Sequence, residues 1–193
     1  ILAKGGRDDV DADNGDDCVI GGEGNDKQLD GGEGNDVVVG NDGNDDIEGG
    51  SGNDIMYGND GNDKMKGGSG KDFVYGGQGE DKIDAGSDDD KVWAGTEDYD
   101  VDGGSGDDEI YGEAGDDELE RGSGNDKISG GLGNDEIKGE SGEDEMYGEE
   151  GNDNIKGDSG NDYLNGGPDT DNLKGNAGTD TCIAGETTSS CEL

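Results

Sequence analysis

Residues 55–75 read IMYGNDGNDKMKGGSGKDFVY, in which three-residue segments alternate with six-residue segments rich in Gly, Asn and Asp. The middle residues of the three-residue segments are Met56, Met65 and Val74, so one large apolar side chain recurs every nine residues. A helix does not produce this period, whereas a short strand followed by a turn does. The middle side chain of such a strand points to one face and its two neighbours point to the other.

The nine-residue unit runs through residues 3–183 in twenty copies, with the consensus G-G-x-G-N-D-x-U-x, where U is a large apolar residue. We number its positions one to nine. One residue is inserted in the third copy, within 27–30, and position six is Asp in nineteen copies, with Tyr99 as the exception. Position eight is apolar in all twenty copies. Such a repeat predicts stacked units that share one continuous core.

The composition restricts the classes of partner. The chain has 193 residues, with 54 acidic against 13 basic side chains, no His and a net charge of −41. This charge argues against binding to nucleic acid or to an anionic membrane surface, and no run is long enough to insert into a membrane. Carboxylates without His and with only three Cys favour a hard cation over zinc or copper.

The copies GGEGNDVVV (31–39), GGSGNDIMY (49–57) and GGLGNDEIK (130–138) resemble the RTX family of calcium-binding nonapeptide repeats. The resemblance extends over residues 3–183. It implies an all-β fold, a right-handed parallel β-roll (a β-solenoid) of about ten coils of 18 residues, with odd and even strands in two separate sheets. We expect one domain over 1–183 and a C-terminal cap over 184–193.

The resemblance also implies that the position-six carboxylate binds Ca²⁺ together with backbone carbonyls of turns in successive coils. If each of eighteen pairs of turns held one ion, the net charge would become −41 + 36 = −5. We therefore expect up to about one Ca²⁺ per repeat as cofactor. The predicted ligands are Asp8, Asp17, Asp26, Asp36, Asp45, Asp54, Asp63, Asp72, Asp81, Asp90, Asp108, Asp117, Asp126, Asp135, Asp144, Asp153, Asp162, Asp171 and Asp180.

Twenty apolar residues make a core too thin to order a chain of this length and charge. We therefore expect a chain that is disordered without Ca²⁺ and folds on binding it, with an affinity of ~10⁻⁴–10⁻³ M. The alternative is a flexible acidic linker that binds cations diffusely. The weakest copies lie within 85–102. Either this repeat is degenerate, with Asp98 or Asp100 standing in for the ligand or the ion lost, or it marks a contact site.

The outer face of the even strands is predicted to differ from that of the odd strands. Seven of the eight aromatic residues fall on the even face, whereas the odd face carries Lys, Asp, Glu and Asn. Strand propensity explains the presence of aromatics but not their segregation, and an apolar patch on such a surface predicts a partner. Tyr57, Tyr75, Trp93 and Tyr111 should stack in a column. The predicted interface comprises Val37, Val39, Ile55, Tyr57, Phe73, Tyr75, Trp93, Tyr111 and Tyr147.

The cysteines and the first residue give expectations about the ends. Cys182 and Cys191 are nine residues apart, and both occupy position eight if the register is extended. They predict a disulfide that closes the last coil, and hence an oxidising compartment; the alternative is two reduced, buried thiols. Cys18 should point outward, for an intermolecular bond or by chance. Ile1 falls at a position eight, so either sequence precedes it or this end stacks on another molecule.

These features predict an extracellular or cell-surface structural protein that binds calcium and associates with itself through the even face, as an oligomer or filament. The rival hypotheses are an adhesin or polysaccharide-binding module of a larger protein, and a module whose apolar face packs on another domain. No set of residues with catalytic spacing stands out, so we do not expect an enzyme.

Overall fold

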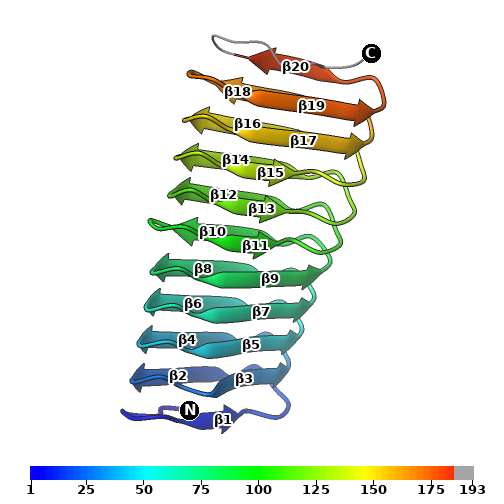
Figure 1. Ribbon diagram of the computed structural model, residues 1–193. Coiled ribbons are helices and arrows are strands. Elements are labelled where there is room, and N and C mark those ends of the chain that lie inside the picture. The colour runs from blue at the N-terminus through cyan, green and yellow to red at the C-terminus, as the bar shows by residue number, and fades with distance from the viewer. Residues whose placement is uncertain (185–193) are drawn as a thin grey trace.

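The computed structural model of the chain describes residues 1–184. These residues form an all-β parallel solenoid, without a helix in the described part, whose coils stack like rungs from the N-terminal end to the C-terminal end (Figure 1). Each coil contributes one strand to each of two ten-stranded parallel sheets, one of odd and one of even strands. The predicted fold class and the separation of odd from even strands are thus confirmed.

The odd sheet contains β1 (Asp9–Asp11), β3 (Gln28–Glu33), β5 (Asp46–Ser51), β7 (Lys64–Ser69), β9 (Lys82–Ser87), β11 (Asp100–Asp102), β13 (Glu118–Glu120), β15 (Glu136–Lys138), β17 (Asn154–Ser159) and β19 (Asn172–Ala177). The even sheet contains β2 (Cys18–Glu23), β4 (Val37–Asp42), β6 (Ile55–Asp60), β8 (Phe73–Gln78), β10 (Lys91–Gly95), β12 (Glu109–Ala114), β14 (Lys127–Leu132), β16 (Glu145–Glu150), β18 (Tyr163–Gly167) and β20 (Thr181–Ala184).

Most strands are longer than the three residues that the periodicity predicts. Thirteen of the twenty have six residues and so continue through positions one to three of the next repeat. The reason is that this segment also stays in register with the coil above, as where Asn41 pairs with Asn59 after Val39 pairs with Tyr57. The turns therefore shrink to positions four to six.

The repeat period sets the register between coils. Val38 pairs with Met56, eighteen residues later, whereas Val10 pairs with Leu29, nineteen residues later. The difference is the inserted residue of the third copy, which the turn before β3 absorbs. Position eight still pairs with position eight at this step, and the even strands take the same nineteen-residue step from Val19 to Val38.

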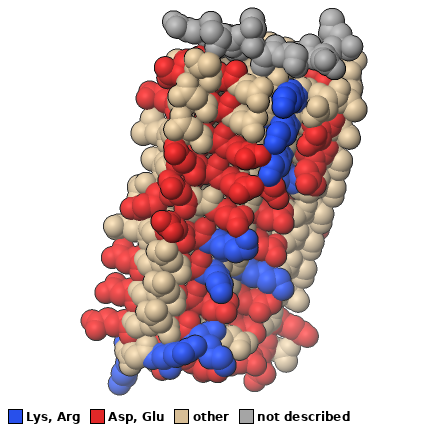
Figure 2. Space-filling view, in the orientation of Figure 1, with Lys and Arg blue, Asp and Glu red and all other residues tan. Residues whose placement is uncertain are grey.

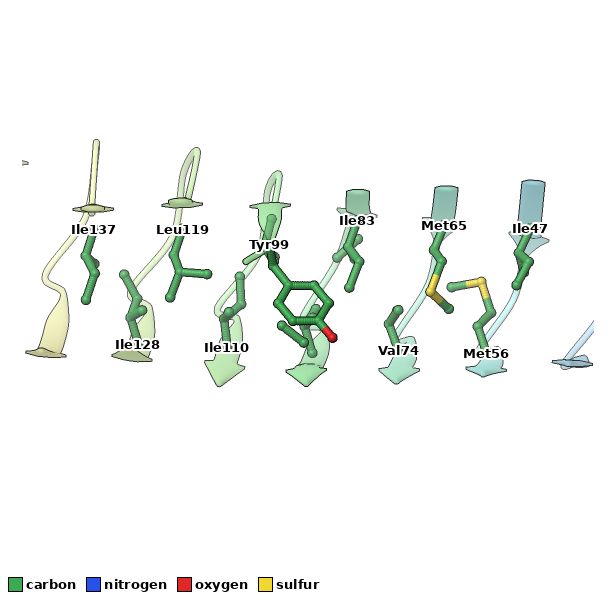
Figure 3. Close-up of a cluster of buried hydrophobic side chains, with 14 of the residues drawn as sticks. Ile47, Met56, Met65, Val74, Ile83, Tyr99, Ile110, Leu119, Ile128 and Ile137 are labelled. Atoms are coloured by element: carbon green, nitrogen blue, oxygen red, sulfur yellow. The ribbon is translucent and has the colours of Figure 1, made fainter. Parts of the chain in front are cut away.

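The core is a double file of the position-eight side chains between the two sheets. Eighteen of the twenty are buried, while Val10 and Cys182 in the end coils are partly buried and pack against the rest. Figure 3 shows the two files facing each other from Ile47 to Ile137. The burial of each large side chain in this core contributes about 1.5–3 kcal/mol of transfer free energy to folding. The predicted core is confirmed.

Position four shows why the turns need glycine. The coils approach so closely there that a β-carbon on Gly52 would lie 1.7 Å from the Gly34 carbonyl oxygen, and Gly52 itself has a φ of 128°. Only glycine adopts this conformation and leaves this space. Asp88 and Asp169, two of the non-glycine residues at position four, adopt left-handed φ values of 77° and 83°.

The outer surface is dominated by charge. Figure 2 shows acidic side chains over most of the visible face, with the basic ones gathered in short columns. On the odd sheet these are cross-coil pairs, such as Lys66 with Glu48 at 3.4 Å and Lys156 with Glu136 at 2.9 Å. Exposed pairs of this kind contribute little to stability. No helix among the described residues is long and apolar enough to cross a membrane.

Candidate metal-binding turns

The position-six side chains line up in two rows along the solenoid. We define the odd row as the residues that precede the odd strands and the even row as those that precede the even strands. The odd row is Asp8, Asp26, Asp45, Asp63, Asp81, Tyr99, Asp117, Asp135, Asp153 and Asp171. The even row is Asp17, Asp36, Asp54, Asp72, Asp90, Asp108, Asp126, Asp144, Asp162 and Asp180.

Sixteen of the nineteen aspartates are buried, and the other three, in the end coils, are half-buried. One carboxylate oxygen of each buried side chain has a defined partner. Asp54 Oδ1 accepts the backbone N–H of Asp36 at 2.8 Å, and Asp72 Oδ1 accepts that of Asp54 at 2.8 Å. A chain of carboxylate–amide hydrogen bonds thus runs from coil to coil and holds each turn against the next.

The second oxygen is different. In eighteen of the nineteen aspartates Oδ2 is buried and has no hydrogen-bond partner, with Asp17 as the exception. Buried polar atoms in folded proteins are almost always paired, and a buried charge without a partner is strongly unfavourable. Two whole rows of such oxygens therefore require a cation or a proton.

In eleven of these turns, Oδ2 lies near a backbone carbonyl oxygen of the next coil, on the side of the position-one glycine. A β-carbon on Gly58 would lie 2.4 Å from Asp63 Oδ2 and 2.5 Å from the Gly76 carbonyl oxygen. On Gly49 it would lie 2.6 Å from Asp54 Oδ2 and 2.8 Å from the Gly67 carbonyl oxygen. Glycine at position one thus leaves open a small space on which a carboxylate and a carbonyl oxygen converge.

Burial without a counter-ion changes the acidity of these groups. Burial raises the pKa of Asp54, Asp63, Asp108, Asp117 and Asp153 to about 6, against the lowering effect of the hydrogen bond from the preceding coil. It raises the pKa to about 7 in Asp72, Asp81, Asp135 and Asp144, and to about 8 in Asp90. The neighbouring aspartate of the same row adds to the rise in most of these turns.

The donor set fits Ca²⁺. No three side chains of His, Cys, Asp or Glu converge among the described residues, so a metal in these turns would take backbone carbonyls for part of its shell. Carboxylate and carbonyl oxygens on a flexible, glycine-rich backbone suit Ca²⁺ in particular. In each turn the position-six aspartate would supply the charged ligand.

The odd row is interrupted at Tyr99. Its ring is buried and lies between the two files of aliphatic side chains (Figure 3). Its hydroxyl donates to the Gly77 carbonyl oxygen at 2.8 Å and accepts the Thr96 N–H at 3.2 Å. Asp98 and Asp100 are exposed, so neither takes the buried place of a position-six carboxylate, and whether either binds an ion stays a prediction. The phenol itself occupies the inside of this turn.

The even row holds a residue that the sequence reasoning missed, Arg121. It is fully buried, and its guanidinium lies within the even row beside Asp108 and Asp126. A signal was present in the sequence, because position one is Gly or Ala in every repeat except this one. Positions four, six and eight, which define the turns, the ligands and the core, are regular in this repeat and do not reveal it.

The predicted aromatic column is confirmed as a stack. The ring centroids of Tyr57 and Tyr75 are 4.9 Å apart, those of Tyr75 and Trp93 4.7 Å, and those of Trp93 and Tyr111 5.7 Å, with interplanar angles of 9°, 7° and 16°. Phe73 is 38% exposed, and the other predicted interface residues are half-buried. Whether this face is an interface stays a prediction.

The structure describes Cys18 and Cys182 but not Cys191, so it checks only part of the cysteine predictions. Cys18 is exposed on the even face, as expected. Cys182 packs against the end of the core, as its position eight requires. Cys191 lies outside the described residues, so the disulfide with Cys182 stays a prediction, as does the cap over 184–193.

Comparison with known proteins agrees with the repeat. A family model described as the RTX calcium-binding nonapeptide repeat, in four copies, matches residues 1–27, 30–65, 57–92, 100–128, 120–155 and 147–182. One of the gaps between these matches, 93–99, contains Glu97 and Tyr99, which replace the Gly and the Asp of positions four and six in the eleventh repeat. No match was found among curated proteins.

Proposed function

Because the chain belongs to the family of RTX calcium-binding nonapeptide repeats, and so forms a calcium-binding β-roll, we propose that it is a secreted structural protein that folds when Ca²⁺ enters its turns and then associates with itself. The single observation that carries the proposal is the pair of rows of buried Oδ2 atoms without a partner. The ligands in this proposal are the nineteen position-six aspartates, each with carbonyl oxygens of its own and the neighbouring coil.

The coupling of folding to calcium follows from charge. At a net charge of −41, the metal-free solenoid brings carboxylates together every coil along both rows. A cation that binds only the folded form adds its binding free energy to folding. Turns built from oxygen ligands in extracellular modules bind Ca²⁺ at ~10⁻⁴–10⁻³ M, so the chain would remain unfolded in a compartment with little calcium.

The test of calcium-driven folding is a titration of the chelated chain with Ca²⁺, followed by circular dichroism and by hydrogen exchange of the strand amides. We expect a cooperative gain of β-structure at ~10⁻⁴–10⁻³ M Ca²⁺. Magnesium is the control ion, because it demands a tighter octahedral shell and gives up its water reluctantly. Full β-structure in chelator at neutral pH would overturn the proposal.

The proposed partner on the even face is a second copy of this chain. The aromatic stack and the aliphatic residues beside it form the part of the outer surface where apolar side chains continue from coil to coil. Long-range charge repulsion falls steeply once Ca²⁺ has neutralised the turns, since the net charge then approaches zero. Assembly is therefore expected only in calcium.

The test of self-association is sedimentation velocity in calcium, with Tyr75 and Trp93 changed to Ser. We expect the wild type to form large, regular species and the double variant to remain a compact monomer with unchanged calcium-induced folding. The matched control changes Lys66 and Asp84 to Ser; these residues occupy the same strand position on the odd face, and their replacement leaves the net charge unchanged. Equal assembly by all three proteins would show that the aromatic face is not the seam.

The second candidate function is polysaccharide binding. Open depressions beside Trp93, lined by Tyr75 and Thr96 on one side and by Tyr111 and Ser129 on the other, are the observation that favours it. Against it, both faces of the Tyr75 ring are covered by Tyr57 and Trp93, which leaves ring edges rather than faces for a sugar. A response of Trp93 fluorescence to glycans, by a monomeric chain in calcium, would favour this alternative.

A further inference from the structure

Arg121 is a buried cation among the residues proposed to bind metal. Its side chain starts at position one of the fourteenth repeat, where the other repeats have Gly or Ala, and has a relative exposure of 0%. The only other arginine of the chain, Arg7, is exposed at position five. An ionised side chain is buried in a folded protein only where opposite charge and hydrogen-bond acceptors surround it.

The surroundings of Arg121 consist of oxygen atoms. Nη1 donates to the Asp108 carbonyl oxygen at 2.6 Å and lies 3.5 Å from Asp126 Oδ1, and Nη2 donates to the Lys127 carbonyl oxygen. A β-carbon on Gly103, at position one of the preceding coil, would lie 3.0 Å from Asp108 Oδ2 and 3.4 Å from Arg121 Cδ. The side chain thus fills the space between the coil of Asp108 and that of Asp126.

The same position in the regular coils is the open space described above. There, a β-carbon would meet the position-six Oδ2 of its own repeat and a carbonyl oxygen of the next coil. Arg121 builds its side chain from that point and sends the guanidinium into the row. It therefore presents one positive charge to two carbonyl oxygens and a carboxylate, which are the ligand types that Ca²⁺ takes.

The odd strands around Arg121 are shorter than the other odd strands of the regular coils. β11, β13 and β15 have three residues each, whereas the odd strands before and after them, from β3 to β9 and from β17 to β19, have six (Figure 1). The lost part of each strand begins at position one, at Gly103, Arg121 and Gly139. The three shortened strands are thus that of Arg121's own coil and those of the coils on both sides, although the position-one amides still donate to the next coil, as from Arg121 to the Lys138 carbonyl oxygen at 3.1 Å.

We propose that the Arg121 guanidinium permanently takes the place of one Ca²⁺ in the even row, between the turns of Asp108 and Asp126. The chain thus carries its own counter-ion at this level and binds one ion fewer than the repeat count implies. The even row is divided into two separate runs of calcium sites. This inference rests on the proposed calcium ligands and adds that one position is closed to metal.

The first test measures the number of Ca²⁺ ions per folded chain by native mass spectrometry and by equilibrium dialysis with elemental analysis. The variants are Arg121→Gly, which restores the consensus, and Arg121→Ala, which is compatible with the fold because Ala85 and Ala94 occupy the same position and are buried. We expect both to bind one Ca²⁺ more than wild type. The control is Arg7→Gly, which makes the same change of net charge at an exposed site and should leave the number unchanged.

The second test needs no variant. A crystal structure of the calcium-loaded wild type, with anomalous scattering used to locate Ca²⁺, should show ions in the even row on both sides of Arg121 and none between Asp108 and Asp126. An ion found there, or equal stoichiometry in wild type, Arg121→Gly and Arg121→Ala, would overturn the inference while leaving calcium binding intact. A wild-type chain that binds no calcium in any turn would instead overturn the proposed function.

Discussion

The turns between β5 and β8 and the central segment 97–121 have the same backbone plan but different interiors. In the former, every turn buries an aspartate whose Oδ2 has no partner, as at Asp54 and Asp63. In the latter, Asp108 and Asp117 keep such an oxygen, but the Tyr99 phenol takes one position of the odd row and the Arg121 guanidinium lies in the even row beside Asp108. The solenoid therefore needs a group inside each turn that interacts favourably with the oxygen atoms there. A metal ion is one such group, and a hydrogen-bond donor from the chain is another.

The two regions consequently depend on solution conditions in different ways. A carboxylate row needs cations from outside the chain, because two aspartates of neighbouring coils repel each other at close range. A phenol and a guanidinium are supplied by the chain itself and carry no such requirement. We therefore expect calcium dependence to be strongest in the regular coils and weakest around Tyr99 and Arg121.

Removal of calcium should produce the largest difference between the two regions. In excess chelator at pH 7.5 we expect the strands β3–β8 to lose protection against hydrogen exchange completely, because their turns hold only unpaired carboxylates. Strands β11–β13 should lose protection last as chelator is added. Hydrogen exchange read by mass spectrometry measures this, with added NaCl at matched ionic strength as the control for general screening. Simultaneous loss along the whole chain would contradict the comparison.

Acid should act in the opposite direction to chelation. The pKa of Asp90, raised to about 8 by burial, and that of Asp72, raised to about 7, lie above their ordinary value of 3.8, so the folded form takes up protons before the unfolded chain does. Protonation therefore favours the metal-free fold. The buried, ionised carboxylates destabilise that fold most above pH ~8, and this destabilisation diminishes as the pH falls through 8 to 6 towards 4. In chelator, lowering the pH from 8 to 5 should raise the β-structure seen by circular dichroism.

The same acidification should weaken calcium binding, because protons and Ca²⁺ compete for the same carboxylates. The concentration of Ca²⁺ at half-folding, measured at each pH, should therefore rise in acid even as the metal-free chain becomes more compact. A metal-free chain equally unfolded at pH 5 and pH 8 would contradict the assignment of these carboxylates to the interior.

A single substitution in a regular turn is the next largest expected effect. Asp63→Asn removes a charged ligand from a buried position, and we expect a loss of one bound Ca²⁺ and of about 3 kcal/mol in the free energy of unfolding in calcium. Asp60→Asn is the matched control, since it makes the same change of charge at the exposed last residue of β6, directly before the same turn. Guanidinium unfolding at saturating calcium distinguishes them, and equal midpoints for the two variants would show that Asp63 holds no ion.

Much of this architecture follows from the sequence because the repeat forces it. One apolar residue in nine predicts the core file from Val10 to Cys182, and the flanks of 55–57 and 73–75 predict the aromatic stack. The period also predicts which aspartates lie in which row. Each of these is a statement about residues that recur, so every copy supports the interpretation of the others.

What the sequence did not predict lies where one copy departs from the rest. The burial of Tyr99 depends on a ring that reaches across the core to the Gly77 carbonyl oxygen, a contact over 22 residues that no local pattern encodes. The burial of Arg121 depends on an oxygen-lined space formed by two separate segments, at Asp108 and at Asp126 and Lys127. The length of the strands depends on register between coils. Each is a tertiary effect on a single residue or segment.

The smallest predicted effect tests the phenol that replaces a carboxylate. Burial raises the pKa of the Tyr99 hydroxyl, so the group keeps its proton and donates it to the Gly77 carbonyl oxygen. Tyr99→Phe would keep the ring and leave this carbonyl and the Thr96 N–H without their partner, which lowers the free energy of unfolding in calcium by about 1–3 kcal/mol. The number of bound Ca²⁺ ions should not change.

Tyr111→Phe is the matched control for this substitution. Its hydroxyl donates to Glu109 Oε2 at 3.3 Å on the outer face, where water replaces a lost partner, so we expect a change within about 0.5 kcal/mol. Guanidinium unfolding of both variants in saturating calcium measures the difference. If Tyr99→Phe were no less stable than Tyr111→Phe, the Tyr99 turn would be held by ring packing alone. The hydrogen-bonding group inside a turn would then be dispensable, and the central segment would differ from the regular coils in shape rather than in the group that fills it.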